Sequence, residues 1–174
     1  MAAAATGRPN RTVDQDRRGQ LEKDAWGALL HVHADLVPLL DRQVQSAAGM
    51  PLAWYDVLLE LNAAPDRRLR MGELGGRVVL SRTRVSRLID ELVGAGLVAR
   101  ENNPNDRRSA YAVLTDLGRS RLRAAAPAYL AGIAAHFGRH LSDEELDVLA
   151  TSLWRVHTAF TGESTANRAP GAAG

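Results

Sequence analysis

The residues best suited to chemistry in this sequence form a short run of arginine and hydroxyl side chains. They are Ser81, Arg82, Thr83, Arg84, Ser86 and Arg87. Forked guanidinium groups can hydrogen-bond guanine O6 and N7, and hydroxyl groups can reach a base or a phosphate. A helix that begins at Ser81 also points its positive end toward a phosphate. The run favours contact with the major groove of DNA, although a solvated helix face has the same composition.

These side chains need a helix that turns them outward, and the apolar spacing predicts one over residues 81–93. The apolar residues at i, i+3, i+4 and i+7 are Val85, Leu88, Ile89 and Leu92. Such spacing is typical of one buried helix face, so Thr83 and Arg87 lie nearly opposite that face. Gly94 or Gly96 is a suitable end for the helix. The buried stripe therefore predicts an exposed face rich in arginine and hydroxyl groups.

A second polar group is predicted at the tip of a β-hairpin. Strands are expected over residues 97–100 and 110–114, and the turn between them holds Asp106, Arg107 and Arg108. Arginines at a projecting tip can enter the minor groove of DNA, where the potential is strongly negative. An ordinary charged turn is the alternative interpretation. Two short helices followed by this hairpin predict a winged helix-turn-helix with double-stranded DNA as its partner.

Apolar stripes predict further helices on both sides of this unit. The expected helices cover about residues 21–47, 51–64, 71–78, 115–139 and 142–160. Thr115 is the expected N-cap of the helix over 115–139, and a capping box from Ser142 to Glu145 is expected to begin the last helix. The first and last of them have wide apolar stripes with no other partner in a chain of 174 residues. We therefore expect these helices to pair two copies of the chain as a homodimer.

The predicted fold class is mainly α with a small β-hairpin wing, a winged helix-turn-helix embedded between dimerisation helices. The predicted segments are a disordered arm over 1–18, a dimerisation helix over 19–50, a DNA-binding lobe over 51–115, C-terminal dimerisation helices over 116–160 and a disordered tail over 161–174.

Charge is distributed unevenly along the chain. Residues 66–108 hold ten arginines against six acidic residues, whereas residues 141–163 hold one arginine against five. The positive charge of residues 66–108 would attract a polyanion such as DNA, whereas the negative charge of residues 141–163 would repel it. The chain contains no cysteine, which excludes disulfides and thiolate metal sites. No apolar run has the length of a signal peptide or a membrane span, so we expect a cytoplasmic protein without membrane contact.

Other groups of titratable residues have simpler explanations than catalysis. His136 and His140 have the i, i+4 spacing of a metal clamp, but no third ligand lies close in the sequence. The acidic run from Asp143 to Glu145 stabilises the first turn of a helix through the helix dipole. With no nucleophile–base pair or phosphate loop, we predict no enzyme, no metal and no cofactor.

A further prediction concerns an effector pocket. His33 lies in the apolar stripe of the first helix, where a satisfied core histidine is the simpler interpretation. Alternatively, His33 lines a pocket with Trp26 and with Tyr55 of the second helix. Aromatic walls and one histidine would suit a small aromatic or carboxylate-bearing effector.

The motifs of this region resemble the MarR family of winged helix-turn-helix transcriptional regulators. The resemblance is carried by residues 74–92, 96–100, 105–108 and 114–118, and it extends over roughly residues 21–160. The Asp-Arg-Arg wing followed by Leu-Thr-x-x-Gly is its most specific element. The resemblance implies that the first, fifth and sixth helices interlock in a dimer. It also implies a cleft in which small effectors bind.

The same resemblance assigns roles in the wing. Arg108 corresponds to the arginine that enters the minor groove, and Asp106 corresponds to the aspartate that steadies it. Because the chain lacks cysteine, oxidation sensing is not supported. The leading hypothesis is a bacterial repressor that binds a palindromic operator as a homodimer and is released by an effector. The alternatives are a constitutive or architectural DNA-binding protein without an effector, and a protein-interaction module that does not bind DNA.

Overall fold

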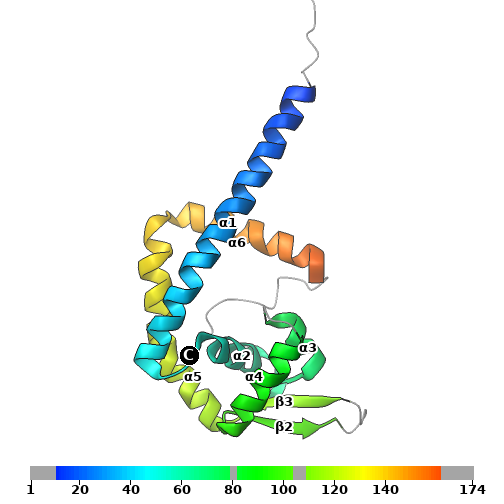
Figure 1. Ribbon diagram of the computed structural model, residues 1–174, viewed down its shortest axis with the longest axis vertical. Coiled ribbons are helices and arrows are strands. Elements are labelled where there is room, and N and C mark those ends of the chain that lie inside the picture. Colours follow the sequence, from blue (N-terminus) through cyan, green and yellow to red (C-terminus); the bar gives the residue numbers. More distant parts are fainter. Residues whose placement is uncertain (1–10, 79–81, 104–108, 162–174) are drawn as a thin grey trace, which may run out of the picture. The chain divides into compact units, whose positions relative to one another are not determined.

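The computed structural model describes residues 11–78, 82–103 and 109–161, and Figure 1 labels the six α-helices and strands β2 and β3 of these ranges. The chain divides into two compact units, residues 1–38 and residues 39–174. Helix α1 (Arg11–Ala48) passes from the first unit into the second. Each unit is described by itself below.

The first unit consists of the N-terminal part of α1, and it corrects one prediction. Residues 11–18 belong to the helix, although they were expected to be part of a disordered arm. Directly after these residues, charged and polar side chains pair at i, i+4 spacing: Arg18 pairs with Glu22 at 2.8 Å, and Gln20 donates to Asp24 at 2.9 Å. Such pairs stabilise a helix without an apolar stripe, so apolar periodicity alone placed the start too late.

The second unit is built on three helices that pack around a common core. They are α2 (Leu52–Ala63), α3 (Met71–Arg77) and α4 (Arg82–Gly94). Pro51 precedes α2 in an extended conformation, as expected for a residue that opens a helix. The most deeply buried large side chains of the described chain include Leu58, Leu61, Leu74, Ile89 and Leu92. This core fixes α4 against α2 and α3.

A three-stranded antiparallel sheet follows, in the order β1-β3-β2. The strands are β1 (Arg68–Arg70), β2 (Val98–Asn102) and β3 (Ala110–Leu114). The predicted hairpin of β2 and β3 is confirmed, with Val98 opposite Leu114 and Asn102 opposite Ala110. Strand β1 was not predicted, because three residues are too few to show an alternating pattern. It pairs with β3 through Arg68 opposite Val113.

Two helices complete the second unit. They are α5 (Asp116–His136), which a 3-10 turn over Gly138–His140 follows, and α6 (Asp143–Thr161). Both predicted N-caps are confirmed: the Thr115 hydroxyl accepts from Gly118 N at 3.0 Å, and Ser142 and Glu145 form a reciprocal capping box. Helix α5 ends three residues earlier than predicted, because the chain tightens into the 3-10 turn.

Two further observations concern the described part of the chain. Within residues 11–78, 82–103 and 109–161, no helix combines the length and the apolar character that crossing a membrane requires. The same residues contain no group of three or more histidine and acidic side chains arranged to hold a metal ion.

Candidate nucleic-acid interface

The face of α4 that was predicted to be buried lies in the core. Val85, Leu88, Ile89 and Leu92 are each at most 8% exposed. Arg84, Ser86 and Arg87 are exposed on the remaining surface of the helix. The pattern confirms the orientation of α4 and leaves two guanidinium groups and one hydroxyl group on its outer side.

Several predicted site residues cannot be placed. Ser81 and the wing-tip residues Asp106, Arg107 and Arg108 lie outside the described residues, as do the side chains of Arg82 and Thr83. Their proposed roles stay predictions. The described strands β2 and β3 nevertheless show that residues 104–108 connect the two strands of a hairpin.

Two polar contacts, both missed by the sequence reasoning, anchor the outer side of α4. Asp90 Oδ1 pairs with Nη2 of Arg100, on strand β2, at 2.8 Å. Nε1 of Trp54, on α2, donates to Glu91 Oε2 at 3.2 Å. The first contact joins α4 to the wing. In it, the guanidinium group of Arg100 neutralises the negative charge of Asp90 on the helix that carries Arg84 and Arg87. Only the folded sheet brings Arg100 to Asp90, so the sequence pattern could not indicate the pair.

The C-terminal end of α4 is set by Gly96. This glycine has a φ of +71°, in the left-handed region that favours glycine. Leu97 N donates to Leu92 O and Gly96 N donates to Val93 O, both at 2.9 Å. These bonds form a glycine-terminated helix end of the Schellman type, as the Gly94 or Gly96 prediction anticipated. The chain then enters β2 directly.

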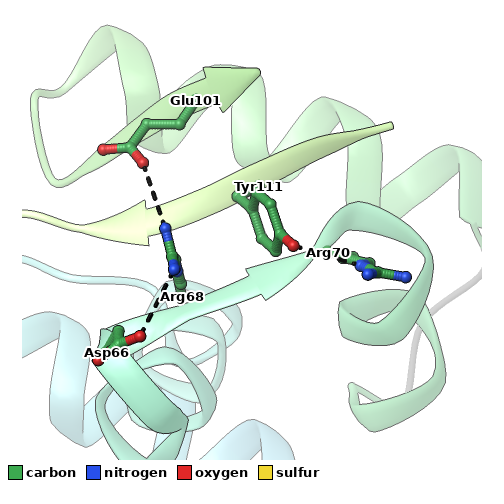
Figure 2. Close-up of polar contacts among 5 residues, drawn as sticks. All are labelled: Asp66, Arg68, Arg70, Glu101 and Tyr111. Atoms are coloured by element: carbon green, nitrogen blue, oxygen red, sulfur yellow. Dashed lines mark hydrogen bonds and ion pairs between the residues drawn. The ribbon is translucent and has the colours of Figure 1, made fainter. Parts of the chain in front are cut away.

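Strand β1 adds two arginines to the outer face of the sheet (Figure 2). Arg68 lies between Asp66 and Glu101, with N–O distances of 3.5 and 4.0 Å, and its guanidinium carbon is 5.1 Å from the centre of the Tyr111 ring. Nε of Arg70 donates to the Tyr111 hydroxyl at 3.4 Å. Nearby carboxylates thus offset the charge of Arg68.

The three predicted effector-pocket residues have different surroundings. In the first unit, Trp26 is 61% exposed and His33 is also exposed, so His33 is not a core histidine within a single chain. In the second unit, Tyr55 is buried, and its ring centre lies 4.6 Å from that of Tyr129. Burial, followed by the influence of Tyr129 and Asp56, raises the pKa of Tyr55 to about 12. The pocket itself stays a prediction.

A carboxyl group beside this tyrosine pair also titrates abnormally. Burial, and then the charge of Glu60, raise the pKa of Asp56 to about 6. No sequence pattern pointed to this residue.

His136, considered above as half of a metal clamp, instead has its Nε2 at 3.2 Å from Nε2 of Gln43 on α1.

Comparisons with known proteins find similarity to transcriptional regulators. A sequence model described as MarR family matches residues 48–109. The chain is 30% identical over 105 residues to the HTH-type transcriptional repressor YetL of Bacillus subtilis. This alignment covers 60% of this chain and 62% of the repressor. Its alignments to this repressor and to another curated relative span 54–62% of their lengths.

Solved structures match over more of their length. Sco3205 of Streptomyces coelicolor, a MarR family transcriptional regulator crystallised in complex with DNA, is similar with a TM-score of 0.73 and 33% identity, over 82% of this chain and 89% of that chain. AbsC, a MarR family transcriptional regulator from the same organism, is similar with a TM-score of 0.72 and 32% identity, over 82% and 96%.

Proposed function

The chain belongs to the MarR family of transcriptional regulators, which are not enzymes, and on that premise we propose that it binds operator DNA in a sequence-specific manner. The observation that carries the proposal is the outer side of α4. Arg84, Ser86 and Arg87 are exposed there, while the opposite face is buried in the core. The similar structure of Sco3205 contains DNA, which supports this role for the fold.

We assign the DNA contacts to two parts of the lobe. The α4 side chains enter the major groove, and Arg108, steadied by Asp106, enters the minor groove. Ser81, Arg82, Thr83 and Arg107 contribute further base or phosphate contacts. The pairing of Asp90 with Arg100 supports this arrangement, because it links the recognition helix to the wing that carries Arg108.

The protein acts as a homodimer on a palindromic site. Support comes from large apolar side chains that a single chain leaves exposed on α1 and α6: Trp26 61%, Leu30 49%, Val156 58% and Phe160 85%. Exposed apolar residues of this number mark an interface with a partner. Two-fold symmetry places the half-sites about one helical turn of DNA apart.

The protein is a repressor that a small aromatic or carboxylate-bearing molecule releases from DNA. The candidate residues for contact with the effector are Trp26, His33 and Tyr55. The phenol hydroxyl of Tyr55 can donate a hydrogen bond to a carboxylate. The effector weakens DNA binding only if its affinity differs between the DNA-competent state and the alternative state.

DNA binding is tested by selecting genomic fragments with the purified full chain and then titrating the selected site at several salt concentrations. We expect a palindromic site and an affinity that falls steeply with salt. Arg108→Ala should weaken binding by about 1–3 kcal/mol, with an unchanged melting temperature. Arg139→Ala, on the 3-10 turn after α5, serves as the matched control. A failure to select any site would overturn DNA binding, and wild-type affinity of Arg108→Ala would overturn the wing assignment.

The effector is tested by screening aromatic acids for a thermal shift and then repeating the DNA titration with each hit. A hit should release DNA from the wild-type protein but not from Trp26→Ala or His33→Ala. If the hits act equally on these variants, the pocket lies elsewhere. If no compound changes DNA binding, the protein is a constitutive DNA-binding protein.

A further inference from the structure

Asn103 and Ser109 join the two strands of the wing beyond the last pair of their ladder. The register of β2 on β3 runs to Asn102 opposite Ala110. One residue further along, Asn103 N donates to Ser109 O at 3.2 Å, and Asn103 Nδ2 donates to Ser109 Oγ at 2.8 Å. Both the backbone and the side chain of Asn103 therefore hold Ser109, and we call this pair the Asn103–Ser109 clamp.

The side chain of Asn103 is buried, which is unusual for its type. Asn103 is 3% exposed, and among the described residues it is the only buried one with a charged or amide side chain. Its neighbour Asn102, on the same strand, is exposed. Burying an amide costs free energy unless its donors are paired, and Ser109 Oγ supplies a partner for Asn103 Nδ2. The clamp is therefore a specific contact and not a pair of solvated surface side chains.

The clamp stands at both ends of the segment that carries the proposed wing contacts. Residues 104–108 connect Asn103 to Ser109, and they include Asp106 and Arg108. A connection whose two ends are fixed side by side has fewer conformations than one whose ends can separate. Restricting a loop before it binds lowers the entropy that binding must overcome. The position of the clamp thus suits it to prepare the wing for DNA.

We propose that Asn103 is a positioning residue for DNA recognition, which through Ser109 holds the ends of the wing connection together so that Arg108 enters the minor groove at a low entropic cost. The inference rests on the proposed function, because it assumes that Arg108 contacts DNA. Asn103 acts without a DNA contact of its own, since its side chain is buried. The clamp therefore changes affinity through Arg108 and leaves the bases preferred by α4 unchanged.

The first test examines the clamp without DNA, by the rate at which trypsin cuts the native full chain after Arg107 and Arg108. Cutting a native protein requires the cut segment to open locally. Asn103→Ala and Ser109→Ala should each raise this rate by roughly threefold to tenfold, as expected for the loss of one hydrogen bond. Asn102→Ala, which changes the exposed asparagine of the same strand, should keep the wild-type rate. Equal rates in all of these proteins would overturn the proposal.

The second test measures affinity for the selected DNA site in a double-mutant cycle with Arg108→Ala. Asn103→Ala alone should weaken binding by about tenfold, whereas Asn102→Ala should bind like the wild type. When residue 108 is already alanine, Asn103→Ala should cause little further loss, because the contact that it positions is gone. A merely structural role would weaken binding by the same factor in both backgrounds. Ser109→Ala gives a second variant if Asn103→Ala does not fold, and Ser109→Thr, which keeps the hydroxyl group, should retain affinity.

The outcomes separate this inference from the proposed function. If the wild type binds DNA and Asn103→Ala binds equally well, the positioning role alone is overturned. The same holds if Asn103→Ala loses an equal factor with and without Arg108. If the wild type selects no DNA site, the proposed function is overturned, and the role of Asn103 is overturned with it.

Discussion

At the scale of single residues, α4 separates its two functions by face. The helical period alternates two kinds of side chain along α4. Buried side chains hold the helix in the core, and exposed side chains are available to DNA. A change on the outer side can therefore alter recognition without altering stability. This separation makes Arg87 a precise probe of the proposed function.

We predict that Arg87→Ala changes which DNA sequence is preferred and does not merely weaken binding. Arg87 is exposed nearly opposite the buried stripe, where a guanidinium can reach base edges. Loss of one such contact should reduce discrimination at its base pair by about 1–3 kcal/mol. Site selection with the variant and with Arg139→Ala measures the effect. An unchanged preferred site with uniformly weaker binding would make Arg87 a phosphate contact.

A second residue-scale prediction concerns pH. The pKa of Asp56 is about 6, above its ordinary 3.8, because burial and Glu60 disfavour the charged carboxylate. The folded protein therefore holds this proton more tightly than the unfolded chain, and Asp56 reduces stability as pH rises from about 4 to about 6. Asp56→Asn should be more stable at pH 7.5 by on the order of 1 kcal/mol, since the Asp56 side chain is only partly shielded and the water that still reaches it screens part of the effect.

Melting curves from pH 4 to pH 8 test this prediction. The gain of Asp56→Asn should become small toward pH 4, where the carboxyl group is protonated in the folded state and partly protonated in the unfolded chain. Wild-type and variant melting temperatures that run parallel across this range would show that Asp56 titrates normally.

At the scale of elements, the junction between β2 and α5 explains the Leu-Thr-x-x-Gly motif. The Thr115 hydroxyl accepts from Gly118 N and donates to the carbonyl oxygens of Gly96 and Leu97, at 2.8 and 3.0 Å. Thr115 N also donates to Leu97 O, at 3.1 Å. A Cβ on Gly118 would lie 2.1 Å from Leu97 O. The motif thus lets the first turn of α5 approach the start of the wing closely.

We predict that Gly118→Ala destabilises the fold, although alanine is the better helix former. The added methyl group must displace a backbone carbonyl, which costs about 1–3 kcal/mol. Gly72→Ala in α3 is the control, because no heavy atom lies within 4 Å of its new Cβ. Thermal unfolding should show a loss of about 2–4 °C per kcal/mol for Gly118→Ala and little change for Gly72→Ala. Equal melting temperatures for both variants would show that the junction adjusts freely.

At the scale of the whole molecule, a single chain leaves much of its helical surface uncovered. Val148, Val156 and Phe160 of α6 are 64%, 58% and 85% exposed, and Leu153 is 39% exposed. Burying one such side chain stabilises a protein by roughly 1.5–3 kcal/mol. A second copy of the chain would gain this energy, so folding and assembly should be coupled.

We predict that Val156→Asp converts the proposed dimer into monomer or aggregate, because it would place a charge in the proposed apolar interface. Thr151→Asp, at an exposed polar position of the same helix, should remain dimeric. Sedimentation measures the oligomeric state of both.

Removing the chain after Ser142 should give an aggregated or unfolded product, and a soluble folded monomer after this truncation would rule out an intertwined dimer.

The sequence alone determined the features that depend on neighbours within one or two helical turns. The buried face of α4, the caps at Thr115 and Ser142 and the hairpin of β2 and β3 are all confirmed. Each rests on a local signal, either a period of hydrophobicity or a capping side chain, and such signals are complete within a short stretch of chain.

Only the tertiary structure decided which distant residues meet. Strand β1 is too short to show a pattern, and it exists because it pairs with β3 more than forty residues later. Asp90 meets Arg100, and Trp54 meets Glu91, for the same reason. These contacts depend on the packing of separate elements around one core, and packing over such separations leaves no periodic trace in the sequence.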